Sequence, residues 1–283
     1  MCTNDIVRAF EGIGARAVVR RTLLARQASP WRFTRRSIIT REMWNEELPT
    51  ALSIERDAKG QFYDLRVRSR TELRVTDARG RHLLLMSIDG ATGERAKYLC
   101  GHDEREWFIA GVPDVRGVSG VASAMEALKP REVRVEQESA HVPASERGER
   151  RTAVYLRQGE WFFLPRPQLQ FPLWLVLSDE PLRRGNGKPH MASYAVRRGG
   201  VLVYVSRRYP NGLTEEERSA LLREQPTLAR ERWLPMRRDP EVYVRGYVTH
   251  PDHERLHLRV WHLVLMNEEH RAPGAMRNVA FLD

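Results

Sequence analysis

Histidines concentrate near the end of the chain, in a short segment that also contains a carboxylate. His250, Asp252, His253 and His257 lie within eight residues. Imidazole and carboxylate groups are ligands of zinc and other divalent transition metals. We expect His190, from an earlier loop, to join them in space. The sequence therefore predicts a candidate metal site of His190, His250, Asp252, His253 and His257. The alternative is a histidine-rich turn without metal, because no closed zinc signature is present.

The residues around this segment alternate with a period of two, which predicts the hairpin that would position it. Residues 242–249 and 256–266 alternate in this way, and the polar residues 250–254 between them have the composition of a turn. Pro251 lacks an N–H and belongs in the turn. His262 falls on the aliphatic face of the second strand, so we expect a buried core histidine rather than a catalytic base.

The opposite face of the predicted hairpin interleaves aromatic and arginine side chains. Aromatic rings stack on nucleic-acid bases, and guanidinium groups neutralise phosphates. The face is therefore a candidate nucleic-acid surface, made by Tyr243, Arg245, Tyr247, Arg259 and Trp261. The alternative is a strand face that a neighbouring segment covers.

The charge balance also favours an anionic partner. The 283 residues carry a net charge of +10, and only four of the 47 basic residues are lysine. Arginine binds phosphate in a bidentate manner and stacks on bases, so nucleic acid, RNA or DNA, is the simplest partner. The alternative is compositional: a GC-rich genome, which encodes arginine in place of lysine, would explain the ratio of arginine to lysine, although not the net charge. The further residues predicted to contact nucleic acid are Arg20, Arg21, Arg32, Arg35, Arg36, Arg183, Arg184 and Lys188.

Composition excludes several classes of protein. A hydrophobic content of 41% is typical of a globular protein. No apolar run approaches the roughly 20 residues of a membrane span, and the first residues do not have the pattern of a signal peptide. The two cysteines, Cys2 and Cys100, make a disulfide framework improbable, so we expect a cytoplasmic location. Cys100 and His102 can form a nucleophile and base, but we expect a buried cysteine beside a polar turn.

The predicted fold class is α+β, dominated by antiparallel sheet in hairpins and a meander, with few helices. We expect three parts: a basic helical segment over residues 1–50, a β-meander with a helix over 51–137, and a β-rich domain with the histidine hairpin over 152–283. The polar stretch 138–151 is predicted to be a linker or long loop. The elements that carry this prediction are a helix over 3–28, strands at 62–68, 72–77, 82–88, 96–100 and 107–112, a helix near 118–128, a buried strand at 171–177, a hairpin around Gly199-Gly200, and a helix capped by Thr214 and Glu217.

A short pattern occurs twice in the chain. Residues 98–109 and 155–163 both run Tyr-Leu, then a polar turn, then Glu-Trp-Phe. Each copy predicts a hairpin whose second strand begins with a large aromatic anchor. The shared core is short, so convergence explains it as well as duplication does.

These observations lead to one expected function and two alternatives. We expect a basic nucleic-acid-binding protein that works as a component of a larger nucleoprotein complex. The first alternative is a structural or assembly protein without chemistry, whose arginines meet acidic protein partners. The second is a metal-dependent hydrolase or nuclease, in which the histidine cluster holds the ion.

Overall fold

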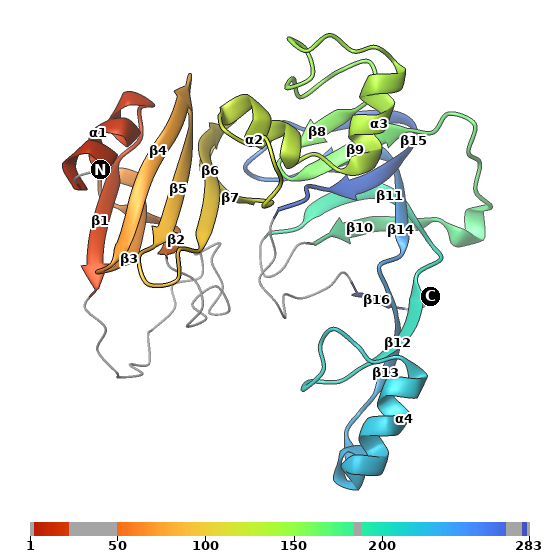
Figure 1. The fold of residues 1–283 in the computed structure, drawn as a ribbon. Coiled ribbons are helices and arrows are strands. Elements are labelled where there is room, and N and C mark those ends of the chain that lie inside the picture. The colour runs from red at the N-terminus through yellow and green to blue at the C-terminus, as the bar shows by residue number, and fades with distance from the viewer. Residues whose placement is uncertain (1–2, 23–49, 184–187, 270–278, 282–283) are drawn as a thin grey trace. The chain divides into compact units, whose positions relative to one another are not determined.

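The computed structural model describes residues 3–22, 50–183, 188–269 and 279–281, and Figure 1 shows its fold. The fold is α+β, with four α-helices and mostly antiparallel sheets in these residues, which confirms the predicted class. The chain divides into two compact units, unit 1 (1–154 with 266–274) and unit 2 (155–265 with 275–283). None of the described helices is long and apolar enough to cross a membrane.

Unit 1 consists, in its described residues, of an antiparallel sheet, a mixed sheet and three helices. The helices are α1 (Thr3–Gly12), α2 (Val121–Ala127) and α3 (Arg131–Ser139). The strands are β1 (Ala17–Thr22), β2 (Thr50–Asp57), β3 (Gly60–Arg68), β4 (Thr71–Arg79), β5 (His82–Asp89), β6 (Arg95–Asp103) and β7 (Glu106–Val112). The order β4-β5-β6-β7 confirms the meander predicted for the strands from 72 to 112, but the predicted first strand of that meander, 62–68, is wrong in its partners, because it is β3 of the other sheet. That sheet has the order β1-β3-β2, in which β1 runs parallel to β3.

The meander sheet of unit 1 is buried on both faces. Leu83 and Leu85 of β5 pack into one core with Tyr63 of β3 and Phe10 of α1. Leu84, which points to the opposite face, packs with residues of α2. Alternation of side chains along a strand explains how one run of leucines supplies both cores.

The predicted helix over residues 3–28 is wrong for residues 13–22, and residues 23–28 lie outside the described residues. The helix ends at Gly12, Gly14 adopts φ +82°, and residues 17–22 form β1. Glycine adopts positive φ without the steric cost of other residues, so Gly14 can turn the chain from helix into strand. Arg20 and Arg21 therefore lie on a strand paired with β3, not on a basic helix.

Unit 2 is built on a six-stranded sheet and a smaller three-stranded sheet. The elements of the larger sheet are β8 (Leu156–Gln158), β9 (Trp161–Pro165), β10 (Leu177–Leu182), β11 (His190–Arg198), β14 (Glu241–Thr249) and β15 (Leu256–Met266), in the order β10-β11-β14-β15-β9-β8. The smaller sheet has the order β12-β13-β16, from β12 (Val201–Val205), β13 (Leu234–Arg238) and β16 (Val279–Phe281). Helix α4 (Glu215–Glu224) begins with the predicted capping box of Thr214 and Glu217.

The histidine-rich hairpin is confirmed. Strands β14 and β15 pair antiparallel on either side of residues 250–255. Gly246 has φ +89° and lies where the pairing of β14 with β15 shifts in register. A bulge with glycine at positive φ interrupts the ladder and increases the local twist. The hairpin therefore forms as the sequence predicts, with an irregularity that strict alternation did not include.

Two other predictions in unit 2 are wrong. Gly199-Gly200 does not close a hairpin, because β11 pairs with β10 and β14 whereas β12 pairs with β13. Both glycines have positive φ and redirect the chain from one sheet to the other. Residues 171–177 do not form a buried strand: Leu173–Leu175 is a 3-10 turn, and the side chains of Leu173 and Trp174 are more than 80% exposed.

Candidate metal centre

The register of the larger sheet brings two of the predicted ligands together. Strands β11 and β14 are antiparallel, and Met191 pairs with Thr249. The next position along each strand places His190 opposite His250. Residues opposite each other on antiparallel strands have Cβ atoms about 5 Å apart. The two imidazole rings are stacked, with their centroids 4.2 Å apart.

A tight turn after β14 adds the third imidazole. The backbone N–H of His253 donates to the carbonyl oxygen of His250 over 3.3 Å, with Pro251 and Asp252 between them. Proline at the second position favours such a turn because its φ is already fixed. The N–H of Asp252 also donates to Nδ1 of His250 over 3.2 Å. The turn therefore holds the ring of His250 and directs His253 toward the same point.

The three histidines form one cluster. One ligand atom from each of His190, His250 and His253 lies within 4.8 Å of the others. Tetrahedral zinc with N ligands at about 2.1 Å places its nitrogens roughly 3.4 Å apart. The three ligand atoms are thus gathered in one place, at separations of up to 4.8 Å, somewhat wider than in a loaded zinc site.

The ring of His190 is buried, and its nitrogens form no hydrogen bonds with the described part of the chain. The residue is only 2% exposed, and neither Nδ1 nor Nε2 has a hydrogen-bond partner among the described residues. Two atoms on either side of the β8–β9 turn, Gln158 Oε1 and Trp161 Nε1, are also buried without a hydrogen-bond partner in the described residues. A buried polar group without a partner costs about 1–3 kcal/mol. A group that binds at this place would recover part of that free energy.

Gly159 leaves room beside the imidazoles. A Cβ atom added to Gly159 would lie 2.9 Å from Nε2 of His253 and 3.4 Å from Nε2 of His190. Gly159 has φ +58°, in the left-handed region that favours glycine. Gln158 fixes this turn, because its Nε2 donates to the carbonyl of Glu254 over 2.5 Å. The β8–β9 turn thus covers the cluster with backbone instead of a side chain.

Burial keeps the cluster in the protonation state that binds metals. Burial, together with the charges that His250 and His253 would carry, lowers the pKa of His190 to about 3. Burial and the charge of His253 also lower the pKa of His250, although Asp252 opposes this. Neutral imidazole is the form that ligates a metal ion. These two rings are therefore ready to bind a cation at neutral pH.

The other two predicted ligands lie outside the cluster. Asp252 forms an ion pair with Lys188, whose Nζ lies 3.0 Å from Oδ2. Burial alone would raise the pKa of Asp252, but Lys188 and the neighbouring histidines lower it overall. His257 is exposed and stacks on Tyr247, with 4.7 Å between ring centroids. The sequence thus named five candidates, and the fold gathers His190, His250 and His253.

The predicted aromatic and basic face is divided between buried and exposed residues. Tyr243 and Trp261 are buried in a small core of unit 2. Arg245, Tyr247 and Arg259 are exposed. The guanidinium carbon of Arg245 lies 5.0 Å from the ring centroid of Trp261. The face is therefore partly covered, as the alternative interpretation expected, but keeps exposed guanidinium groups.

The other predicted nucleic-acid contacts are dispersed. Arg20 lies in unit 1, 2.7 Å from the buried carboxylate of Asp64, and Arg21 donates to the carbonyls of Ser69 and Thr71. Arg183 is exposed at the end of β10. The four remaining predicted arginines lie outside the described residues: Arg32, Arg35, Arg36 and Arg184.

Many arginines are paired with acids of their own unit. These ion pairs reduce the positive charge that is available to a polyanion in the described parts of the chain. The pairs include Arg16–Asp57, Arg56–Glu106, Arg66–Asp64, Arg74–Glu72, Arg197–Glu180, Arg208–Glu231 and Arg218–Glu215.

The residues that sequence reasoning missed come from the second copy of the repeated pattern. Gln158, Gly159 and Trp161 border the cluster, yet the chain separates them from His250 by about ninety residues. The signal for a special turn was the glycine in Tyr155-Leu-Arg-Gln-Gly-Glu-Trp161. Its neighbours could be found only once β9 was known to lie beside β15.

No protein-family model matches this chain, and comparison with curated proteins and with solved structures returns no significant relative. The geometry of the cluster therefore carries the functional argument by itself.

Proposed function

We propose that the chain is a metal-dependent hydrolase, with one zinc-type divalent ion bound in unit 2 by His190, His250 and His253. The observation that carries the proposal is the gathering of three imidazoles beside Gly159, around a histidine that is 2% exposed and whose ring nitrogens form no hydrogen bonds with the described residues. A buried imidazole without partners is costly, whereas a bound ion would satisfy it.

The donor set fits a catalytic site better than a closed structural one. Structural zinc sites usually have four protein ligands, while catalytic sites have three and keep the fourth position for water. An ion held in this way lowers the pKa of its bound water to about 7. Such an ion, held by His190, His250 and His253, would supply an activated water as the nucleophile for a phosphorus or carbonyl centre, and the leaving group would take its proton from solvent.

The first experiment measures metal binding by the full chain. The protein is stripped with a chelator, dialysed against Zn²⁺, Co²⁺ or Mn²⁺, and analysed for metal content and thermal stability. We expect one equivalent of ion and a rise in Tm of the metal-loaded chain, because a ligand that binds only the folded state stabilises it. Less than about 0.2 equivalents with no change in Tm would overturn the proposal.

A matched pair of variants makes this test specific. His190→Gln removes a clustered imidazole, and His257→Gln removes an exposed imidazole of the same hairpin that lies outside the cluster. The first variant should lose the bound ion, and the second should keep it. Equal losses would point to unspecific binding by surface histidines. Hydrolysis of bis(p-nitrophenyl) phosphate, measured in all three proteins, then tests the activity separately from binding.

Nucleic-acid contact is a second candidate, and one observation favours it. Arg255 lies over Tyr247, with 4.3 Å between the guanidinium carbon and the ring centroid, and Tyr247 stacks on His257. All three side chains are exposed on the hairpin that carries the cluster. Stacked arginine and aromatic groups suit bases and phosphates. A nucleic acid bound there would also be a phosphodiester close to the proposed ion.

Binding of labelled single-stranded RNA and DNA across a salt series tests this second candidate. Electrostatic binding should weaken steeply as salt rises, and Arg255→Gln should weaken it further. No binding at low salt would remove the nucleic-acid candidate. If the arginines instead serve acidic protein partners within an assembly, complexes isolated with the chain would survive nuclease treatment.

A further inference from the structure

A second concave site lies elsewhere in unit 2. Its cavity of about 300 Å³ lies between the β14–β15 pair and the segment before β10. Leu169, Phe171, Val176 and Trp261 supply the apolar wall, and Arg245 contributes the positive charge. Arg245 lies in β14 and His250 directly follows that strand, five residues farther along the chain, so roughly 17 Å of extended backbone separates this cavity from the histidines. The two sites are therefore distinct.

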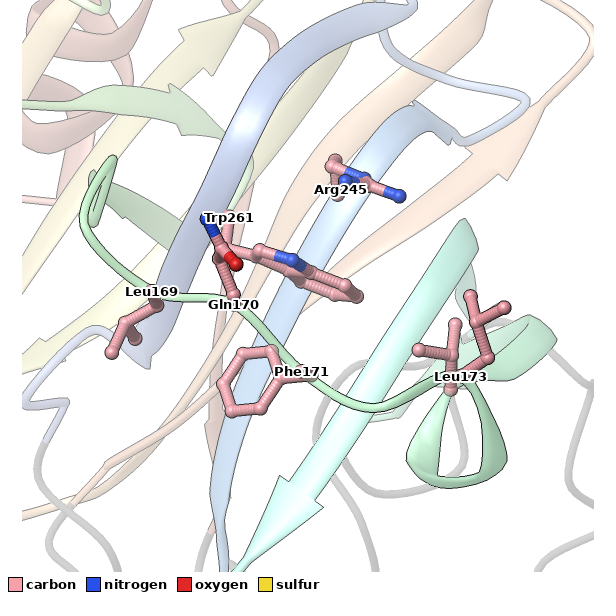
Figure 2. A pocket seen from close by; sticks show the side chains of 7 residues that line it. Leu169, Gln170, Phe171, Leu173, Arg245 and Trp261 are labelled. Atoms are coloured by element: carbon pink, nitrogen blue, oxygen red, sulfur yellow. The ribbon is translucent and has the colours of Figure 1, made fainter.

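The wall of the cavity is made of packed aromatic rings. The ring of Phe171 meets the indole of Trp261 edge to face, with centroids 5.0 Å apart and an angle of 89°. The backbone N–H of Arg166 donates to the carbonyl of Trp261 over 2.7 Å, which fastens the segment to β15. Figure 2 shows Leu169, Gln170 and Phe171 on one loop that passes over the strands, with Arg245 on the other side of Trp261. The apolar wall is thus held by packing and by the backbone.

The charge of Arg245 is held in position by aromatic rings instead of by an acid. Its guanidinium carbon lies 5.0 Å from the ring centroid of Trp261 and 6.0 Å from that of Tyr194. Within residues 50–183 and 188–269, no carboxylate forms an ion pair with Arg245, although many other arginines in this chain have such a partner. A guanidinium fixed by stacking keeps its planar N–H groups available for a bidentate anion.

We propose that this cavity binds a small carboxylate with an apolar, preferably aromatic, body. The carboxylate would pair with Arg245, and the body would lie against Phe171 and Trp261. The amide of Gln170, which lines the cavity, would add a directed hydrogen bond. The volume of about 300 Å³ is at the lower end of the range for ligand pockets, so a compact ligand fits better than a large one. The site is independent of the proposed metal centre.

The probes for this proposal are 2-naphthoate and its neutral counterpart 2-naphthylmethanol, measured with the full chain by isothermal titration calorimetry. We expect 2-naphthoate to bind with a Kd below about 1 mM and the alcohol to bind at least about tenfold more weakly, since only the carboxylate engages the guanidinium. Equal affinities for the two probes, or no binding of 2-naphthoate at 5 mM, would overturn the proposal.

Two variants separate this cavity from general basic charge. Arg245→Gln should weaken 2-naphthoate binding at least about tenfold. Arg259→Gln removes an exposed arginine of β15 that does not line the cavity, and its affinity should stay within about twofold of the parent protein. Circular dichroism confirms that both variants fold. Equal losses in the two variants would overturn the proposal, as would an Arg245-dependent site that binds oligo(dT) and not 2-naphthoate.

Discussion

Two hairpins of similar sequence occupy the two units, and their turns differ in one physical respect. The hairpin of β6 and β7 in unit 1 and the hairpin of β8 and β9 in unit 2 both carry Tyr-Leu before the turn and Glu-Trp-Phe after it. Both form as predicted. Each also places a tryptophan near a histidine. The ring centroids of Trp107 and His102 are 4.9 Å apart, and those of Trp161 and His190 are 6.3 Å apart. The two histidines nevertheless have different surroundings.

The turn of unit 1 is satisfied by its own unit. Arg150 binds the carboxylates of both Asp103 and Glu104, the latter over 2.6 Å. Cys100 is fully buried, and burial raises the pKa of its thiol, which makes it a poor nucleophile at neutral pH. His102 lies beside Trp107 and belongs to no cluster of potential ligands in the described residues. This turn needs no ligand to explain its residues.

The turn of unit 2 has buried polar atoms that its own unit leaves without hydrogen bonds, at Gln158, Trp161 and His190. The comparison therefore teaches that residue type alone does not distinguish the candidate metal site from the first turn. Cysteine, histidine and two acids cluster in the first turn, and only glutamine and glutamate flank glycine in the second. The distinguishing property is whether the buried polar groups are satisfied.

The sharpest test of the comparison replaces with glutamine the histidine that lies near the tryptophan of each hairpin. His190→Gln should reduce zinc affinity more than about 100-fold, because even changes outside the ligand shell often cost 10–100-fold. His102→Gln, beside Trp107 in unit 1, should change it less than about twofold. Equilibrium dialysis against a zinc buffer measures both affinities. If the two variants lose zinc equally, the difference between the turns has no bearing on metal binding.

Glycine in the second turn provides the next largest effect. Gly159→Ala should weaken zinc binding at least about tenfold, because the new Cβ would lie 2.9 Å from Nε2 of His253. The change also imposes strain of roughly 1–2 kcal/mol at positive φ. Gly80→Ala is the matched control, since Gly80 has the same φ of +58° and open space around it. The control should lose stability alone, and a loss of zinc in both variants would assign the effect to strain.

In the metal-free protein, the two units should also lose stability at opposite ends of the pH range. The folded pKa of His190 is about 3, below the 6.5 of an exposed histidine, so the unfolded chain binds more protons as pH falls from 6.5 toward 3. Unit 2 should therefore lose stability over that range. Burial raises the pKa of Tyr98 in unit 1 to about 12, so unit 1 should lose stability as pH rises from 10 toward 12.

Hydrogen exchange resolved by peptide separates these two responses. Protection in β11 and β14 should fall on acidification, and His190→Gln should reduce that fall. Protection in β6 should persist from pH 6.5 to about 4, above the range in which the unfolded-state carboxyls of Asp57 and Asp89 take up protons, and should fall in alkali. Loss of protection in both units at the same pH would indicate a general charge effect instead of the two buried groups.

The smallest expected effect concerns the ion pairs of the first turn. Arg150→Gln should destabilise unit 1 by at most about 1 kcal/mol, because partly exposed ion pairs contribute little. It should leave zinc affinity unchanged. Chemical denaturation measures the free energy of unfolding. A loss of metal binding in this variant would show that the two turns are coupled.

Local pattern was sufficient to predict the elements that carry the site. Alternation and Pro251 predicted the β14–β15 hairpin, and the turn composition predicted that His250 and His253 lie together. The sequence also named His190, as the last residue of a glycine-containing loop that was expected to approach the later histidines in space. Gln158 and Gly159 could not be found in this way, since strand order across the six-stranded sheet depends on packing that is not local in sequence.

The wrong predictions have a shared physical cause. Gly199-Gly200 has the composition of a hairpin turn, but a pair of glycines at positive φ can also lead the chain into another sheet. The apolar run at 171–177 was interpreted as buried, yet Trp174 is 84% exposed. Local composition determines which backbone conformations are accessible, while the partner of each strand depends on side-chain packing across the whole core.

The measurement that tests the central claim most directly is X-ray absorption of the zinc-loaded chain, which counts imidazole ligands at the ion. We predict one zinc per chain with three histidine nitrogens at about 2.0–2.1 Å and one further oxygen ligand. The same spectrum of His190→Gln should lose a histidine or lose the ion. A zinc site with fewer than two histidines, or a spectrum that His190→Gln leaves unchanged, would contradict the account.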